Sequence, residues 1–149
     1  MIIKKTTDID LLVRLRMDYL FDKKERPADT AALQANLRNY FSRHITAGDF
    51  LAVIAEENGE VFSAALMTFS ERPPRSAEPL VIGTVYSVYT YPHHRRKGYA
   101  RAVMTSLLDE AKSMGVIVIE LLATPDGEAL YRSMGFRETD YRYLRMKAE

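Results

Sequence analysis

A strand, a helix and a second strand follow one another in the second half of the chain, and this pattern most constrains the fold. The segment "LVIGTVYSVYT" (residues 80–90) is rich in β-branched and aromatic residues, which favour a strand. From Ala100 to Met114 the apolar residues recur at helical spacing, and Gly115 can end that helix. The segment "VIVIELLA" (residues 116–123) predicts the second strand. Both strands are almost continuously apolar, so we expect a βαβ unit with two parallel strands buried on both faces.

The N-terminal part of the chain predicts a short strand and two helices. Residues 2–6 favour the strand, and Thr7 or Asp8 can cap the helix that follows it. A polar, proline-containing loop comes next, after which Asp29 or Thr30 can cap the second helix. These elements place helices before the central strands in sequence.

Turn signals divide the remaining segments. Asn58-Gly59 lies between two apolar runs and predicts a β-hairpin with a type I′ turn. Residues 70–79 are rich in proline and polar residues and predict a loop. Residues 126–135 predict a short helix that ends at Gly135, and "FRETDYRYLRM" predicts a final strand or hairpin. The whole pattern indicates an α/β (α+β) fold with a mixed central sheet, and we expect residues 1–149 to form one domain.

Composition narrows the classes of function. The formal net charge is +1, so no global field favours nucleic acid or a membrane surface. No apolar run is long enough for a membrane span and no signal peptide is recognisable, which predicts a cytoplasmic protein. The chain has no cysteine, which excludes disulfides, thiolate metal sites and a cysteine nucleophile. We expect no metal.

The stretch "YPHHRRKGYARAVM" (residues 91–104) joins the predicted strand to the predicted helix and can bind an anion. The first turn of a helix carries free N–H groups and partial positive charge, which together suit phosphate. Gly98 lets a ligand approach the backbone, and Ala100 keeps the surface small. The full charges come from Arg95, Arg96, Lys97 and Arg101. A solvated basic face and a nucleic-acid contact are the alternatives.

Two segments resemble the GNAT N-acetyltransferase superfamily. "VYTYPHHRRKGYARAVM" resembles its acetyl-CoA-binding motif V-x-P-x-x-[QR]-x-x-G-x-[GA], with Arg95, Gly98 and Ala100 at the last three defined positions. "ELLATPDGEALYRSMGF" resembles the family segment A-x-x-L-Y-x-x-x-G-F, matched by residues 130–131 and 135–136. The two motifs lie within residues 80–139, in the order and at the separation that the family shows.

The resemblance implies a GNAT-like fold in which the fourth and fifth strands splay apart around acetyl-CoA. Backbone N–H groups of residues 96–101 would hold the pyrophosphate, and the edge of residues 88–90 would pair with the pantetheine arm. Thr124 or Pro125 stands where family members often carry asparagine. The coenzyme-binding residues implied are Val88, Tyr89, Thr90, Arg95, Arg96, Lys97, Gly98, Tyr99, Ala100, Arg101 and Thr124.

The implied reaction is direct acetyl transfer to a primary amine in a ternary complex, since no thiol can carry the acetyl group. Tyr131 matches the family's general acid, with a packing tyrosine as the alternative. The general base stays unassigned, because residues 80–90 contain no acid. Glu120 is a candidate, and the alternative is that its carboxylate forms a salt bridge. His93 and His94 have suitable chemistry but stand in the phosphate motif.

The acceptor is an unidentified small-molecule or peptide amine. Asp18, Asp22 and Glu25 could attract a cationic amine or be solvated acids. Tyr19, Tyr40, Tyr86 and Tyr89 could line its pocket or pack in the core. A second reading is an acyl-CoA-binding sensor or regulatory module without strong catalysis. Family members often dimerise, so the resemblance is compatible with a homodimer.

Overall fold

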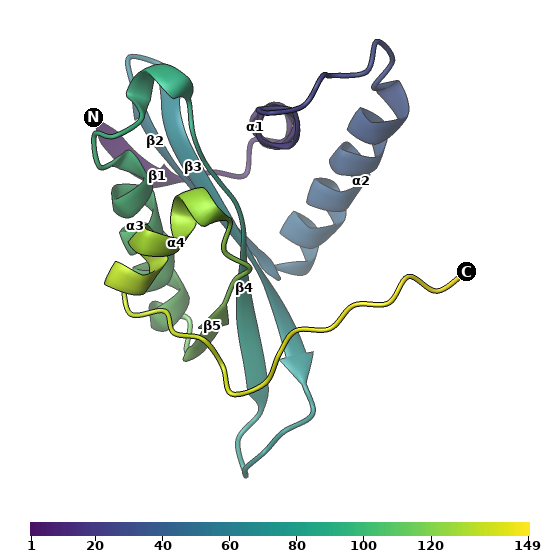
Figure 1. Cartoon of the computed structure of the whole chain (residues 1–149), viewed down its shortest axis with the longest axis vertical. Helices are drawn as coiled ribbons and strands as arrows, with labels where there is room; N and C mark the ends of the chain where they lie inside the picture. Colours follow the sequence, from purple (N-terminus) through teal and green to yellow (C-terminus); the bar gives the residue numbers. More distant parts are fainter.

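The structure, a computed structural model that describes residues 1–149, is built on a five-stranded sheet whose strands follow chain order (Figure 1). The strands are β1 (Ile2–Lys5), β2 (Phe50–Glu57), β3 (Glu60–Arg72), β4 (Leu80–Thr90) and β5 (Val118–Glu120). The pairs from β1 to β4 are antiparallel, and β4 and β5 are parallel. The parallel pair confirms the predicted βαβ unit and the mixed sheet.

Helices cover both faces of the sheet. They are α1 (Ile9–Leu20), α2 (Ala31–Ala47), α3 (Tyr99–Ser113) and α4 (Pro125–Ser133), with a short 3₁₀ turn, η1, at Pro92–His94. Figure 1 shows α3 and α4 on one side of the sheet and α1 and α2 on the other. No helix combines the length and the apolar character that a membrane span requires.

Local sequence signals explain where several elements begin and turn. The Asp8 side chain accepts a hydrogen bond of 3.2 Å from the Leu11 amide, so it caps α1 as predicted. Asn58 and Gly59 have φ values of 52° and 80°, the left-handed values that the predicted type I′ hairpin needs. Gly115, at φ 84°, follows α3 where its stop was expected.

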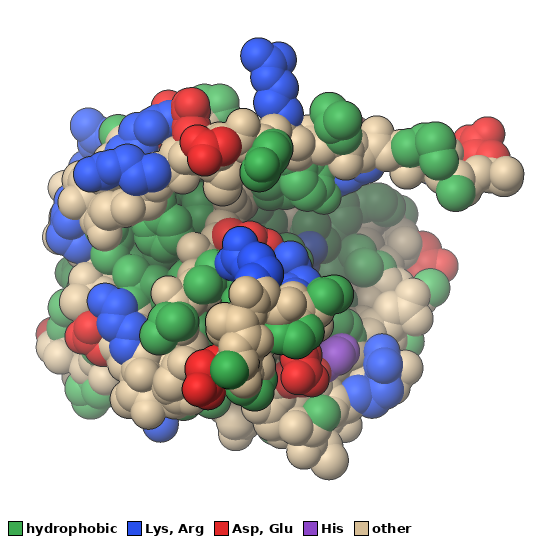
Figure 2. Space-filling view, turned by 90° about the horizontal axis from the view of Figure 1, so that it is seen from below, with side chains coloured by type: hydrophobic (Ala, Val, Ile, Leu, Met, Phe, Trp, Pro, Cys, Tyr) green, Lys and Arg blue, Asp and Glu red, His purple; other side chains and the backbone are tan.

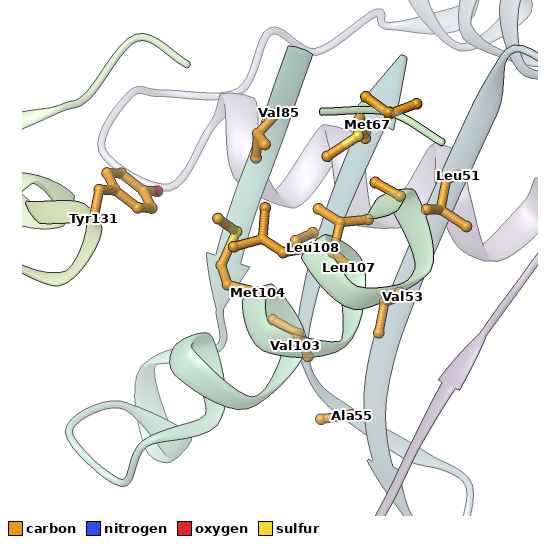
Figure 3. Close-up of a cluster of buried hydrophobic side chains, with 13 residues drawn as sticks. Leu51, Val53, Ala55, Met67, Val85, Val103, Met104, Leu107, Leu108 and Tyr131 are labelled. Atoms are coloured by element: carbon orange, nitrogen blue, oxygen red, sulfur yellow. The ribbon is translucent and has the colours of Figure 1, made fainter. Parts of the chain in front are cut away.

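The core lies in two layers because successive residues of a strand face opposite sides of the sheet. In β2, Leu51 and Val53 pack against the α3 side, whereas Ala52 and Ile54 pack against α1 and its neighbours. The α3 layer is the larger cluster, and Figure 3 shows the helix side chains directed at those of the strands. Its fully buried helical members include Val103, Met104 and Leu107.

Three expectations about the strands are corrected by the structure. The fifth strand spans only Val118–Glu120 instead of residues 116–123, and Ile117 and Leu122 beside it are 89% and 63% exposed. It lies at the edge of the sheet, and none of its three residues is buried, so it is not buried on both faces. In β4, Tyr86 is likewise exposed. The strand β3 continues to Arg72 opposite Leu80, which shortens the loop expected over residues 70–79.

The predicted final strand or hairpin is wrong. After α4 the chain forms no further helix or strand, and Tyr141 and Tyr143 are 88% and 68% exposed. A strand needs a partner to satisfy its backbone, and no strand pairs with this segment. Beside the start of this segment, an open hollow of about 540 Å³ lies between β5, α4 and residues 135–139. Figure 2 shows hydrophobic side chains recessed behind the projecting end of the chain.

The core predicts a sharp contrast between two leucine truncations. Leu107→Ala removes a side chain with no exposed surface and should lower the free energy of unfolding by about 2–5 kcal/mol. Leu144→Ala truncates a side chain that is 86% exposed, so its change should stay within about 0.5 kcal/mol. Urea unfolding followed by circular dichroism measures both. Similar losses in the two variants would contradict the placement of the C-terminal residues outside the core.

Candidate active site

The turn from β4 into α3 contains two residues in the left-handed backbone conformation, and only one of them is a glycine. Gly98 has φ 86° and Arg96 has φ 65°, so two residues of this turn are left-handed. Glycine adopts this conformation without strain, whereas arginine does so at a cost. No atom lies within 4 Å of the position that a Cβ of Gly98 would take, so the space beside it is open.

Free backbone donors gather at this turn. The first hydrogen bond of α3 runs from the Ala102 amide to the Gly98 carbonyl, at 3.1 Å. No amide from Arg96 to Arg101 donates to an acceptor in the protein. These consecutive N–H groups lie at the positive end of the helix dipole on an exposed turn, at the position where the sequence predicts an anion cradle.

The cations of this turn fall into two groups. The Arg95 guanidinium donates to the Thr90 carbonyl at 2.8 Å and to Asp22 at 3.0 Å, and Arg101 donates to Ser133 at 2.7 Å. These two side chains therefore hold the turn to its neighbours in the protein. Arg96 and Lys97 are exposed and take part in no ion pair, so their charges are available to a ligand.

The histidines of the turn also differ. The His94 ring stacks on Phe62 with 3.8 Å between centroids, and its Nε2 lies 3.1 Å from Glu60. The other ring neighbour of Phe62 is Tyr99, at 5.3 Å. His94 thus belongs to the packing beneath the turn. His93 is exposed on η1.

A long edge of β4 lacks a neighbouring strand. The parallel ladder joins Ile82, Gly83 and Thr84 to β5 and then stops, while β4 continues to Thr90. The backbone from Val85 to Thr90 is therefore open on the β5 side. This is the splayed pair of strands that the resemblance implies, and it includes Val88, Tyr89 and Thr90.

A β-bulge lies within this open stretch. Leu66 of β3 pairs with Tyr86, and Ala64 pairs with Tyr89, so β4 has one residue more than β3 between these pairs. Ser87, at φ 52°, takes up the difference. A bulge turns side chains and bends the strand, here beside the open edge. The sequence gives no signal for this bulge, since Ser87 is neither glycine nor asparagine.

Tyr131 reaches from α4 toward β4. Its side chain is 9% exposed, and Figure 3 shows its hydroxyl at the end of the ring nearer the strand that carries Val85. The hydroxyl makes no hydrogen bond within the protein and is not sealed from solvent. Burial, with a smaller effect of Tyr19, raises the pKa of Tyr131 above its ordinary value. The phenol therefore keeps its proton at neutral and moderately alkaline pH.

Glu120 lies at the end of β5, and Thr124 lies at the start of α4. The Glu120 carboxylate is half-exposed and accepts from Arg72 at 3.0 Å, which is the salt-bridged alternative to a base. Thr124 is the N-cap of α4 and its carbonyl accepts from the Gly127 and Glu128 amides, at 3.0 and 3.1 Å. Its side chain makes no capping bond and is exposed. The structure has no group of three or more His, Cys, Asp or Glu side chains suited to a metal ion.

Two acids near the C-terminal end of α1, Asp18 on the helix and Asp22 just after it, are already paired. The Tyr89 hydroxyl donates to Asp22 at 3.0 Å, and burial followed by this bond raises the pKa of Tyr89 to about 12. The Tyr91 hydroxyl donates to Asp18, and burial and this bond raise its pKa further still. Arg95 and Arg26 supply the opposite charges: Arg95 to Asp22, and Arg26 to Asp18 at 3.0 Å. Two of the three acids considered for attracting a cationic amine are therefore compensated within the protein.

Comparison with known proteins identifies the family. The sequence profile of the Acetyltransferase (GNAT) family matches residues 10–136, and the chain therefore belongs to this family. A search among curated proteins found no match.

Solved structures of acetyltransferases share the fold. A predicted acetyltransferase with acetyl-CoA from Clostridium acetobutylicum is 29% identical, with a TM-score of 0.86 over 98% of this chain and 95% of that one. A GCN5-related N-acetyltransferase from Ralstonia eutropha JMP134 is 26% identical, with a TM-score of 0.79 over 97% of each chain. Glucosamine-6-phosphate N-acetyltransferase from Arabidopsis thaliana, at 15% identity and a TM-score of 0.73 over 98% of this chain and 99% of that one, shares the fold alone.

The position of Tyr131 depends on a glycine one helical turn earlier. A Cβ on Gly127 would lie 2.7 Å from Cε2 and 3.1 Å from the hydroxyl oxygen of the Tyr131 ring. Gly127→Ala should therefore displace the ring and lower the free energy of unfolding by about 1–3 kcal/mol through overpacking. Glu128→Ala, an exposed alanine substitution on the same helix, is the control and should change stability little. An unshifted ring in the crystal structure of Gly127→Ala would rule out this contact.

Proposed function

We propose that the protein is an acetyl-CoA-dependent N-acetyltransferase that transfers acetyl directly to a primary amine in a ternary complex. The observation that carries the proposal is the row of free amides from Arg96 to Arg101, placed at the end of the open edge of β4. A helix start with free donors suits a pyrophosphate, and an unpaired strand edge suits an amide-containing arm. Coenzyme A carries both groups on one molecule.

The residues present fit such a ligand. The amides from Arg96 to Arg101, Gly98 and Tyr99 included, would hold the pyrophosphate, with Arg96 and Lys97 adding charge. The open edge from Val88 to Thr90 would pair with the pantetheine arm, and Thr124 borders the opposite side of the gap. Arg95 and Arg101 would act by holding the turn in shape, since their guanidinium groups bond to the protein.

The chemistry assigns one role to Tyr131. A carbon–nitrogen bond forms to the acceptor while the thioester carbon–sulfur bond breaks, the amine loses a proton and the thiolate gains one. Tyr131 has the neutral phenol that can donate to the thiolate, and its raised pKa keeps that proton in place. The thioester supplies an acyl group that is already activated, so no enzyme thiol is needed. We assign no general base; Glu120 remains a candidate whose carboxylate is shared with Arg72.

An acyl-CoA-binding sensor or regulatory module is the second candidate. The absence of an acid from β4, together with the ion pair of Glu120, favours it. A broad amine screen that detects released coenzyme A thiol separates the two functions, because a sensor binds acetyl-CoA without turnover. Robust thiol release with any amine would exclude the sensor.

Calorimetry with acetyl-CoA tests the donor site, and two variants test its backbone origin. Gly98→Ala forces a Cβ into a left-handed conformation that costs about 1–2 kcal/mol, so we expect roughly tenfold weaker binding. Arg96→Gly keeps the left-handed φ and removes one free cation, so its loss should be smaller. If Arg96→Gly binds more weakly than Gly98→Ala, side-chain charge rather than backbone dominates. If the unaltered protein does not bind acetyl-CoA, the proposed function is wrong.

Removal of the Tyr131 hydroxyl tests the acid. Tyr131→Phe keeps the ring and its packing but removes the proton donor, so we expect kcat to fall about 100-fold at unchanged acetyl-CoA affinity. Steady-state thiol release measures kcat, and calorimetry measures affinity. Unchanged kcat in this variant would refute the role of Tyr131.

A further inference from the structure

Arg16 is a half-buried cation on α1 that the donor site does not use. Its guanidinium donates to the Ser87 hydroxyl at 2.7 Å and lies 5.4 Å from the centre of the Tyr19 ring. It takes part in none of the ion pairs of the chain. One hydroxyl and one ring face satisfy only part of a guanidinium, which has five N–H donors.

The neighbouring acids do not form ion pairs with Arg16. Asp18 on α1 and Asp22, just past the end of that helix, follow Arg16 in the chain, but Arg26 and Arg95 already bond to them. Asp49, which raises the pKa of Tyr40 where Arg16 lowers it, lies 2.8 Å from His44 and forms no ion pair with Arg16. No carboxylate of the protein therefore forms an ion pair with Arg16. A charge that is partly withdrawn from water without such a partner carries a desolvation cost, which an anionic ligand would offset.

Arg16 also lies beside the proposed reaction centre. Its partner Ser87 is the bulge residue of β4 and directly precedes Val88, where the open edge receives the coenzyme arm. Tyr19 packs edge-on against Tyr89 with 6.4 Å between centroids. Tyr19 also makes the smaller contribution, after burial, to the raised pKa of Tyr131. A group bound at Arg16 would therefore lie on the α1 side of β4, beside the bulge in the open edge.

We infer that Arg16 binds an anionic group of the acceptor, a carboxylate or a phosphate, and that the acceptor is an amine that carries such a group. This inference rests on the proposed function and narrows its substrate. The planar guanidinium forms paired hydrogen bonds with either anion. The same charge repels a second ammonium group, so polyamines are poor acceptors. Tyr86 precedes Ser87 on β4 and is exposed.

The alternative role for Arg16 is to hold Ser87 in its bulge, and two variants separate the roles. Arg16→Gln removes the charge but keeps an N–H donor for Ser87. Ser87→Ala removes the hydroxyl but keeps the charge. If Arg16 binds the acceptor anion, Arg16→Gln loses the preference for anionic amines and Ser87→Ala keeps it. If Arg16 only positions the bulge, the two variants affect charged and neutral amines alike.

The experiment measures kcat/KM for matched amines in both variants and in the unaltered protein. The pairs are β-alanine with β-alaninamide, for a carboxylate, and phosphoethanolamine with ethanolamine, for a phosphate; putrescine represents the polyamines. We expect the unaltered protein to prefer one anionic partner by about 10-fold to 100-fold, as charged hydrogen bonds imply. In Arg16→Gln this ratio should fall close to one, through a higher KM. The pair that shows the preference identifies the anion.

The outcomes also separate this inference from the proposed function. The inference is overturned if the unaltered protein shows a preference near one, or if it turns over putrescine better than the anionic amines. It is also overturned if the preference survives Arg16→Gln. Turnover of neither anionic amine, while acetyl-CoA still binds, overturns it as well. Failure to bind acetyl-CoA in calorimetry instead removes the proposed function. Unchanged acetyl-CoA affinity in Arg16→Gln shows that the variant is folded.

Discussion

The early end of the β4–β5 ladder is the constraint on which the rest of the structure depends. The two strands share only the pairs from Ile82 to Thr84, and β4 then runs on with one partner instead of two. Backbone N–H and C=O groups need partners, so the free edge must be satisfied by water or by a ligand. The bulge at Ser87 keeps the edge irregular, which also discourages pairing with a strand of another molecule. The site therefore follows from an incomplete sheet.

Two layers meet at this gap. The α3 layer provides the free amides and the core on which they rest, while the α1 layer provides Arg16, Tyr19 and the paired acids. Tyr131 lies in the first layer, yet Tyr19 of the second influences its proton. In the proposed function, this arrangement separates recognition of the donor from recognition of the acceptor.

The parts of the fold that the sequence predicted correctly are those set by local signals. The cap at Asp8, the turn at Asn58-Gly59 and the stop at Gly115 each depend on residues next to one another. The predicted final strand failed because a strand depends on a distant partner, which no pattern within the segment reveals. The fifth strand was too long for the same reason. In the site, the glycine and helix start were readable, but Arg95 was not: its partner Asp22 is 73 residues away.

The proposed donor cradle consists of backbone amides, and every residue except proline has an amide N–H. Its shape is set by the left-handed turns at Arg96 and Gly98 and by the start of α3. The side chains that project from the cradle are therefore free to vary as long as the backbone keeps its course. Recognition through Arg16 has the opposite character, because a single codon change removes it. A protein built in this way can keep one coenzyme through evolution while it exchanges one acceptor for another.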